Sequence, residues 1–366
     1  MDSHIDITRG WVSGEFDLSD DGETQADLPK LAHGGIDAAV FVVFCGQLPR
    51  SAENYDRMWL RAGQQFDAIE RTVAAQTAQI EIARSPADVE RIVSSGKRAA
   101  CVAVENGGIL AKDLSRVSVI AGHGAAYITI CHNGHNDICD SSQPRRAEPP
   151  EEHDGLSAFG RDVIAEMNRL GIMVDVSHAS VSSTAQAVET SSAPVIASHS
   201  CCRAVLDAPR NLYDDQLSLI HESGGVVQVT ALGHLVATTP PEYRPRLKQL
   251  VIDLGISDVD PDSLPEAEID RANEAIAALQ AEFTLPSVKT FVDHLEHAVR
   301  QTDISAVGIG SDFNGGGGLI GWEDVADSVN VTFEMAGRGF SEDEIAAIWG
   351  GNLLRVWRRA RELASE

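Results

Sequence analysis

The sequence predicts a single α/β domain folded as a (β/α)8, TIM-like barrel. Eight short, β-branched apolar runs are spread along the 366 residues, and amphipathic helix patterns lie between many of them. The runs are continuous rather than alternating, as expected for parallel strands that are buried on both faces. Repeated alternation of strand and helix favours a parallel barrel, and this length lies within the upper range of one such domain. We therefore expect one barrel domain over residues 1–366.

The expected elements follow one another in order along the chain. The strands span about Asp2–Ile7, Ala38–Phe44, Ala99–Glu105, Ala126–His132, Met173–Ser177, Val195–Ser198, Val226–Thr230 and Ala306–Ser311. Among the helices, Arg161–Leu170 has its apolar residues on one stripe and is followed by a glycine, a favourable C-cap. Asp67–Ile82 and Val288–Arg300 show the same pattern. A capping box at residues 341–344 predicts a further helix near the end of the chain.

The interval before the last strand is longer than the others. It covers roughly residues 231–285 and contains Glu/Ala-rich stretches such as Pro265–Phe283, which are typical of helices. Apolar residues such as Leu250, Val251, Ile276 and Leu279 are unlike those of a linker. We therefore expect a helical insertion that packs on the barrel.

The charge balance argues against two classes of partner. The chain has 55 acidic and 29 basic residues, a formal net charge of -26, and it contains no Lys/Arg cluster. Such a surface disfavours binding to nucleic acid and to anionic membranes. No apolar run approaches the length of a membrane span, and no leader pattern precedes the first strand. We expect no nucleic-acid partner, no membrane partner and a cytoplasmic location.

The cysteines point to the same compartment. The six of them show no C-x-x-C spacing and no framework of a small disulfide-rich domain. They are Cys45, Cys101, Cys131, Cys139, Cys201 and Cys202. We expect all six to be reduced thiols, which is typical of a reducing compartment.

Groups that can bind a metal or move a proton stand where six of the eight apolar runs end. These runs are Asp2–Asp6, Val102–Glu105, Ile128–His132, Val174–His178, Val195–His199 and Val307–Asp312. A (β/α)8 barrel has its active site at the C-terminal ends of its strands, so these groups are expected to converge. On the first strand, His4 and Asp6 are two residues apart and therefore point to the same face.

Five of these residues form a nitrogen and oxygen ligand set that suits zinc: His4, Asp6, Glu105, His178 and His199. Five ligands exceed the usual set for one catalytic zinc, whereas two Zn²⁺ ions that share a carboxylate would use them all. Glu105 is the natural bridge, together with a water or hydroxide. Two Zn²⁺ ions with Asp6, Glu105 and a hydroxide would leave about one positive charge, which Asp312 could offset.

Each of these residues also has a structural interpretation. Glu105 could form a buried salt bridge, and His178 and His199 could share a structural role. Asp312 could cap a turn, and Arg210 could belong to a surface ion pair. The remaining candidates among the histidines, His33, His123, His221, His234, His294 and His297, we interpret as core or surface residues.

The same residues carry a resemblance to the membrane (renal) dipeptidase family of dizinc metallopeptidases. It covers essentially the whole chain in order, through short motifs. These are Ser3–Asp6, Val104–Gly107, Thr129–Asn133, Asp175–His178, Ser198–Ser200, Pro209–Asn211, Gly308–Phe313 and the closing Gly351–Val356. The resemblance implies a dipeptidase that hydrolyses the peptide bond of free dipeptides by means of a metal-bound hydroxide, and it implies a homodimer.

The resemblance also implies roles for individual residues. His4 and Asp6 would hold one zinc, His178 and His199 the other, and Glu105 would bridge both. Beyond the ligands, His132 would polarise the scissile carbonyl, Arg210 would bind the C-terminal carboxylate of the dipeptide, and Asp312 would transfer the proton.

Two positions depart from the family pattern. Asn314 stands where many relatives have a second aspartate, and Gln228–Gly233 lacks the Asn-Phe-Tyr type of sequence. Both bear on side-chain preference more than on the reaction. The alternative functions are another barrel metallohydrolase (amidase, lactonase or deaminase) and a non-catalytic binding protein. Other barrel metallohydrolases commonly use a carboxylated lysine as the bridging ligand, where this chain has Glu105. A non-catalytic binding protein would be expected to have lost at least one of the metal ligands, His132 or Asp312, and this chain has kept them all.

Overall fold

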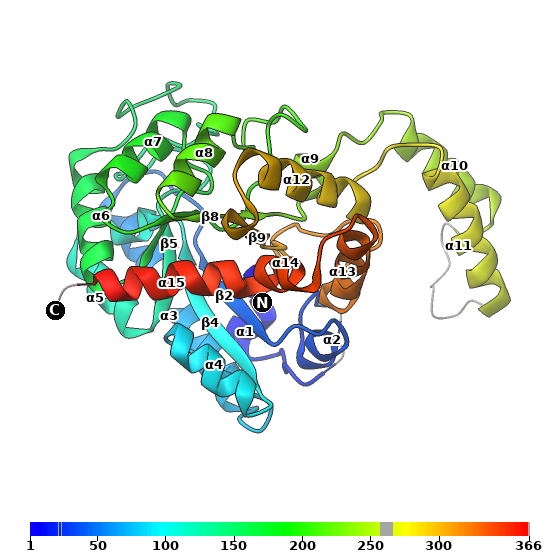
Figure 1. Cartoon of the computed structure of the whole chain (residues 1–366), viewed down its shortest axis with the longest axis horizontal. Coiled ribbons are helices and arrows are strands. Elements are labelled where there is room, and N and C mark those ends of the chain that lie inside the picture. Colours follow the sequence, from blue (N-terminus) through cyan, green and yellow to red (C-terminus); the bar gives the residue numbers. More distant parts are fainter. Residues whose placement is uncertain (21, 23, 257–265, 365–366) are drawn as a thin grey trace.

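The computed structural model describes the whole chain except residues 21, 23, 257–265 and 365–366. Its strands are β1 (Asp2–Asp6), β2 (Ala38–Phe44), β3 (Ile80–Ile82), β4 (Arg98–Glu105), β5 (Ala125–Thr129), β6 (Met173–Asp175), β7 (Val195–Ala197), β8 (Val226–Val229) and β9 (Val307–Ile309). Apart from β3, they pair in parallel in the order β1-β2-β4-β5-β6-β7-β8-β9 and form a nearly closed barrel within a layer of helices (Figure 1). The predicted (β/α)8 fold is confirmed.

The barrel closes between its first strand and the segment that follows its last strand. The amide of Asp6 donates to the carbonyl of Phe313 at 2.9 Å, and the amide of Asp312 donates to the carbonyl of His4 at 2.9 Å. Two segments of the chain that are about 300 residues apart in sequence are thereby joined next to the candidate ligands.

All eight predicted strands are present, and the structure adds β3 at a place where we expected a helix. The predicted helix Asp67–Ile82 is correct only in its first part, because α3 (Ala52–Ala74) ends at Ala74. Beyond it, Ile80–Ile82 pairs with the start of β4. Ile80 and Ile82, two positions apart, share one face of a strand but not of a helix, and the edge of β4 was available for pairing.

The helices around the barrel have the following bounds. They are α1 (Arg9–Ser13), α2 (Leu28–His33), α3, α4 (Pro86–Ser94), α5 (Ser115–Gly122), α6 (Ala158–Leu170), α7 (Val181–Thr190), α8 (Asp214–Glu222), α9 (Gly233–Val236), α10 (Tyr243–Asp253), α11 (Glu266–Gln280), α12 (Val288–Gln301), α13 (Ser328–Gly337), α14 (Glu342–Ala346) and α15 (Asn352–Leu363). The predicted C-cap Gly171 has a φ of 72°, and the predicted capping box of Ser341 and Glu344 is formed. Both helix predictions are confirmed.

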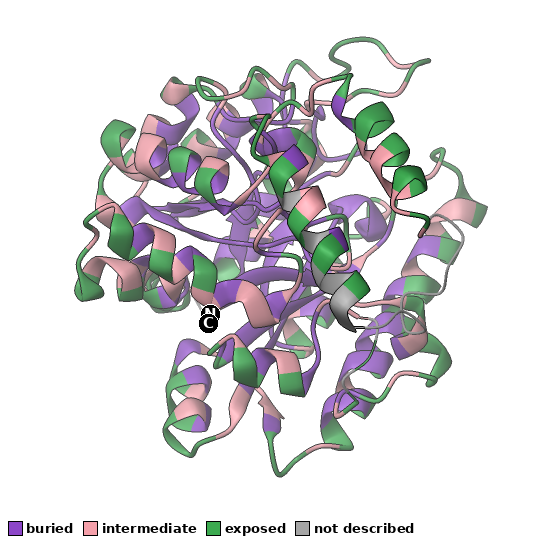
Figure 2. Ribbon diagram, turned by 90° about the vertical axis from the view of Figure 1, so that its right-hand side faces the viewer, coloured by how far each residue is buried: buried purple, intermediate pink, exposed green. Residues whose placement is uncertain are grey.

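Alternate residues of the strands face two different apolar layers. On β2, Ala39, Phe41 and Val43 pack toward the surrounding helices. Their neighbours Ala38 and Val40 face the barrel interior together with Trp357 of α15. Figure 2 shows the strands as almost continuously buried. The lower interior is thus filled by apolar side chains and closed by α15, which leaves the opposite, C-terminal end for polar groups.

The long interval before the last strand forms an arm. After the short α9, helices α10 and α11 pack on each other and extend away from the barrel (Figure 1). Their apolar residues form a small cluster of Tyr243, Leu247, Leu250, Leu279 and Phe283, with Leu285 and Ile320 at its base. Our expectation of an insertion that packs on the barrel is therefore correct only at the base of this arm. Pro265, the expected start of its second helix, lies outside the described residues.

The six cysteines are buried and unbridged, as expected. Burial raises the pKa of the Cys45 thiol to about 11 and those of Cys101 and Cys201 to about 12. Raised pKa values keep these thiols protonated and unreactive near neutral pH. Among the described residues, no helix combines the length and the apolar character that crossing a membrane requires.

Candidate metal centre

The predicted ligands meet at the C-terminal end of the barrel. His4 and Asp6 share the inner face of β1, and Glu105 is the last residue of β4. His178 and His199 follow the ends of β6 and β7 within three residues. Four of them, Asp6, Glu105, His178 and His199, line one cavity of about 470 Å³. Its lining is Asp6, Ile7, Phe44, Arg61, Gln65, Glu105, His132, Asn133, Gln143, His178, His199, Arg210, Leu232, His234, Asp312, Asn314 and Gly315, with His4 directly beneath.

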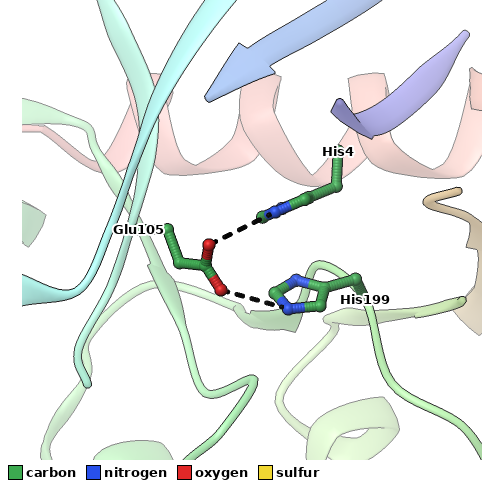
Figure 3. Close-up of side chains that lie close together, drawn as sticks. All are labelled: His4, Glu105 and His199. Atoms are coloured by element: carbon green, nitrogen blue, oxygen red, sulfur yellow. Dashed lines mark ion pairs between the residues drawn. The ribbon is translucent and has the colours of Figure 1, made fainter. Parts of the chain in front are cut away.

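Glu105 stands at the centre of the histidines. Its Oε1 lies 2.9 Å from Nε2 of His178 and 3.3 Å from Nε2 of His199, while its Oε2 lies 3.7 Å from Nε2 of His4. Figure 3 shows His4 and His199 one above the other on the same side of the carboxylate, each facing a different one of its oxygens. Both oxygens of one carboxylate therefore face histidine nitrogens, which is the arrangement that a bridging ligand requires.

The tautomer of His4 follows from its partner below the site. The Tyr127 hydroxyl donates to the carbonyl of Ser3 at 2.8 Å and lies 2.8 Å from Nδ1 of His4. A phenol has one proton to donate, so it must accept from Nδ1–H of His4. Nε2 of His4 then carries a lone pair, and this buried atom has no hydrogen-bond partner among the described residues. A buried imidazole nitrogen that carries a lone pair and accepts no hydrogen bond is suited to bind a metal ion.

The same reasoning applies to the other two histidines. Ser198 Oγ donates to Asp175 at 2.6 Å and therefore accepts from Nδ1–H of His199 at 2.8 Å. Nδ1 of His178 lies 3.1 Å from the side-chain oxygen of Asn133, an acceptor. The Nε2 atoms of His178 and His199, only 3.0 Å apart, thus face each other with lone pairs. Two acceptors at this distance repel unless a cation lies beside both.

The pKa values of His178 and His199 agree with this assignment, whereas that of His4 does not. Burial would lower the pKa of His4, but the neighbouring carboxylates, above all Glu105, outweigh it and raise the pKa. Burial, as the largest cause, holds the pKa of His178 and of His199 well below the usual range of histidine, so both rings are neutral. Burial also raises the pKa of Asp6 and of Asp312 well above normal. For Glu105, burial would raise the pKa, but the surrounding histidines outweigh it and lower the pKa well below normal.

Three buried carboxylates beside one another are costly unless cations compensate them. The donor atoms fall into three overlapping groups: His4, Glu105 and His199; Glu105, His132 and His178; and His4, Asp6 and Asp312. Within each group the atoms lie within 4.8 Å of one another. The residues present therefore fit divalent metal ions with mixed nitrogen and oxygen ligands. The division of ligands between two ions implied by the resemblance stays a prediction.

His132 and Asp312 lie beside the five ligands rather than apart from them. His132 Nε2 is 3.8 Å from Oε1 of Glu105, and its ring packs against Phe44 and His178 at centroid distances of 4.8 and 4.2 Å. Burial lowers the pKa of His132, so its ring is neutral and keeps one N–H to donate. Asp312 is buried on the opposite side of the cavity, within reach of Asp6 and His4.

Arg210 is buried at the cavity wall and is not part of a surface ion pair. Its Nη1 donates to Ser200 Oγ at 2.8 Å and its Nη2 to the carbonyl of His199 at 2.9 Å. The bonds leave one hydrogen on each terminal nitrogen, and Nε has no partner among the described residues. The guanidinium is thus fixed in place with donors available to a ligand.

The structure adds supporting residues that we did not predict. Tyr127 and Asp175 face the interior one layer below the ligands and orient them through hydrogen bonds. A Cβ on Gly315 would lie 2.0 Å from a carboxylate oxygen of Asp6 and 2.4 Å from one of Asp312, so only glycine fits there. The inward-facing alternation of β5 and β6 could have indicated Tyr127 and Asp175, whereas the approach of Gly315 depends on a loop fold that local sequence does not determine.

Two further histidines and one departure from the family pattern can be placed in the structure. We interpreted His234 as a core or surface residue; it is exposed, as a surface residue would be, and it also lines the cavity. His294 is structural as expected, since its ring bonds the amide of Cys202 and the carbonyl of Val236. Asn314 accepts from the amide of Gln25 and donates to the carbonyl of Asp6, which holds the loop next to the site.

Comparison with known proteins agrees with this geometry. The family model described as membrane dipeptidase (peptidase family M19) matches residues 1–366. Dipeptidase tcpJ of Claviceps purpurea is 28% identical over 360 residues, which cover 97% of this chain and 73% of that protein. Human Dipeptidase 3 is 30% identical over 357 residues, or 97% of this chain and 62% of its own length.

Solved structures show the same relationship. The probable dipeptidase PvdM from Pseudomonas aeruginosa superposes with a TM-score of 0.85 at 31% identity, covering 99% of this chain and 95% of that one. A metallopeptidase from Rhodobacter sphaeroides, liganded with a phosphinate mimic of L-Ala-D-Ala, shares the fold with a TM-score of 0.76 at 20% identity, over 98% of each chain. With a family match over the whole chain and a polar centre of the composition described above, this chain belongs to the membrane dipeptidase family of metallopeptidases, M19, and is a dipeptidase.

Proposed function

We propose that this protein is a zinc-dependent dipeptidase that hydrolyses the peptide bond of free dipeptides with two metal ions. The observation that carries the proposal is the convergence of three imidazole nitrogens with free lone pairs, those of His4, His178 and His199, on the two oxygens of Glu105. The nitrogen and oxygen donors suit zinc, and a shared carboxylate suits a pair of ions. His4 and Asp6 would hold one ion, His178 and His199 the other, and Glu105 both.

When bound, such ions lower the pKa of a water molecule and polarise a carbonyl group. The residues of the chain do the rest. His132, neutral and with one N–H, is suited to donate a hydrogen bond to the oxygen of the scissile carbonyl as negative charge develops on it. Asp312 is suited to receive the proton released by the attacking water and to pass it to the leaving amine.

The two ends of a dipeptide match two charged regions of the cavity. Arg210, buried and with unused donors, suits the C-terminal carboxylate as a planar, charge-assisted partner. Across the cavity, Asp6 and Asp312 would provide negative charge for the free amine once bound cations offset the effect of burial on their pKa values. Fixed charges at both ends would limit cleavage to two residues, since a longer or blocked substrate would bury an unpaired group.

The test is a substrate panel assayed with zinc-loaded protein. Free dipeptides should be cleaved, whereas amidated dipeptides, N-acetylated dipeptides and tripeptides should be poor substrates. Preferred cleavage of a lactone or of a nucleobase amine would favour another metallohydrolase of this barrel type. Binding of dipeptides without turnover in metal-loaded protein would favour the non-catalytic alternative.

The cytoplasmic location and the homodimer stay predictions. The resemblance is what supports the dimer, and sedimentation of the purified chain at about twice the mass of one copy would bear it out. Fractionation of cells that express the full-length protein addresses its location.

A further inference from the structure

We propose that Arg61 selects dipeptides whose N-terminal residue carries an acidic side chain. This inference rests on the proposed dipeptidase function and names the substrate class of the same cavity. Arg61 lies on α3, the helix that follows β2, and its side chain lines the cavity that the metal ligands line.

The first observation is that Arg61 has no counter-charge. The described residues provide no ion pair and no hydrogen-bond acceptor for its guanidinium, although the chain has 55 acidic residues. Its helical neighbours at the positions three and four residues away are Arg57, Met58, Gln64 and Gln65, and none is acidic. An arginine that faces a cavity without a partner is available to a ligand anion.

The second observation is that several other polar groups of the cavity wall have partners of their own, while His234, which has none among the described residues, is kept neutral because burial lowers its pKa. Gln65 bonds the amide and the carbonyl of Phe44, Asn133 bonds His178, and Asn314 bonds Gln25. In the proposed function, the C-terminal carboxylate of the dipeptide pairs with Arg210 and its free amine with Asp312. A positive charge at Arg61 is left over, and it matches a third charge on the substrate, which can only come from a side chain.

The order of the strands indicates which side chain this is. In the closed barrel, β1 lies between β9 and β2, and β7 lies across from β2. The amine end of the substrate belongs beside Asp6 and Asp312, which come from β1 and from the loop after β9. Arg210 follows β7 and takes the carboxylate on the far side. Arg61, which follows β2, is therefore on the side of the N-terminal residue.

Because Arg61 is an exposed residue at the cavity rim, its contribution should be modest. Partly solvated ion pairs typically change an equilibrium by a factor of up to about five and weaken with salt. We therefore expect selectivity among dipeptides rather than an absolute requirement for an acidic residue.

The experiment compares matched substrates that differ in charge but hardly in shape. For the wild-type enzyme, kcat/KM for glutamyl-alanine should exceed that for glutaminyl-alanine by up to about five-fold, and added salt should reduce this ratio. In Arg61→Ala the ratio should fall to about one, and in Arg61→Glu it should fall below one. The control is Arg57→Ala, one turn earlier on the same helix and not at the cavity, which should keep the wild-type ratio.

Three results would overturn the inference. The wild-type enzyme could show no preference for the acidic substrate, the preference could survive in Arg61→Ala, or it could appear for alanyl-glutamate over alanyl-glutamine instead. Cleavage of alanyl-alanine separates this inference from the function on which it rests. If alanyl-alanine is hydrolysed without any charge preference, only the role of Arg61 fails; if no dipeptide is hydrolysed by metal-loaded protein, the proposed function fails as well.

Discussion

The hydroxyl oxygen of Tyr127 lies 2.8 Å from Nδ1 of His4, inside the barrel and directly below the candidate metal ligands. The hydroxyl gives its own proton to the carbonyl of Ser3, so it holds His4 in the tautomer whose Nε2 is free to bind a metal. A residue outside the candidate ligand set would thus decide which nitrogen of His4 can bind a metal.

Tyr127→Phe should retain the fold and lower metal affinity by about 10–100-fold, as is typical when the partner of a ligating histidine is lost. Competition with a metal-binding dye measures the affinity. Tyr243→Phe, the same change in the α10–α11 arm, is the control and should leave the affinity unchanged. Equal affinities in Tyr127→Phe and the wild type would mean that Tyr127 does not orient His4.

Metal content should fall in steps as ligands are removed. Chelator-free protein should contain about two zinc ions per chain, and His199→Ala about one, because one pair of imidazole ligands is broken. Elemental analysis provides the number. As a control, His297→Ala removes a histidine that pairs with Asp214 outside the cavity and should keep the wild-type content. Full activity with a single ion would remove the bridging role of Glu105.

His132→Ala should keep the metal content and lower kcat by a factor of about 10²–10³, as for the loss of one oxyanion donor. The structure makes this test informative, because the donor atom of His132 also falls within one of the groups that could hold a metal. Loss of zinc together with activity would identify His132 as a ligand instead of an oxyanion donor.

Asp312→Asn preserves shape and removes the ability to transfer a proton. We expect kcat to fall by about 10²–10⁴-fold with both metals retained. Steady-state kinetics on a free dipeptide, combined with elemental analysis of the same sample, measures both quantities. Near-normal turnover would exclude Asp312 as the group that moves the proton.

Arg210→Ala should weaken kcat/KM for a free dipeptide by roughly 2–4 kcal/mol, since a buried carboxylate loses its partner. For the corresponding amidated dipeptide, already a poor substrate, the same variant should change little. The two enzymes and two substrates form a double-mutant cycle that isolates the contact. Equal losses on acid and amide would show that Arg210 does not recognise the carboxylate.

Local sequence determined most of the barrel and indicated the candidate ligands. Buried parallel strands require continuous apolar runs, and a barrel collects the residues at the ends of those runs, so His4, Glu105 and His199 could be expected to meet. Two-residue spacing on β1 placed His4 and Asp6 on one face without knowledge of the fold. The capping box at Ser341 and the glycine after α6 likewise determine helix ends through contacts with residues only a few positions away.

Tertiary structure decided what depends on contacts between distant segments. Ile80–Ile82 became a strand because an edge of β4 was available to it, and the arm of α10 and α11 buries its apolar side chains within itself. The histidine tautomers are fixed by Tyr127 and Asp175, which lie more than 20 residues away from His4 and His199 along the chain. Hydrogen bonds and close approaches of this kind have no local signal, because they arise only when the barrel closes and brings its strand ends within contact distance.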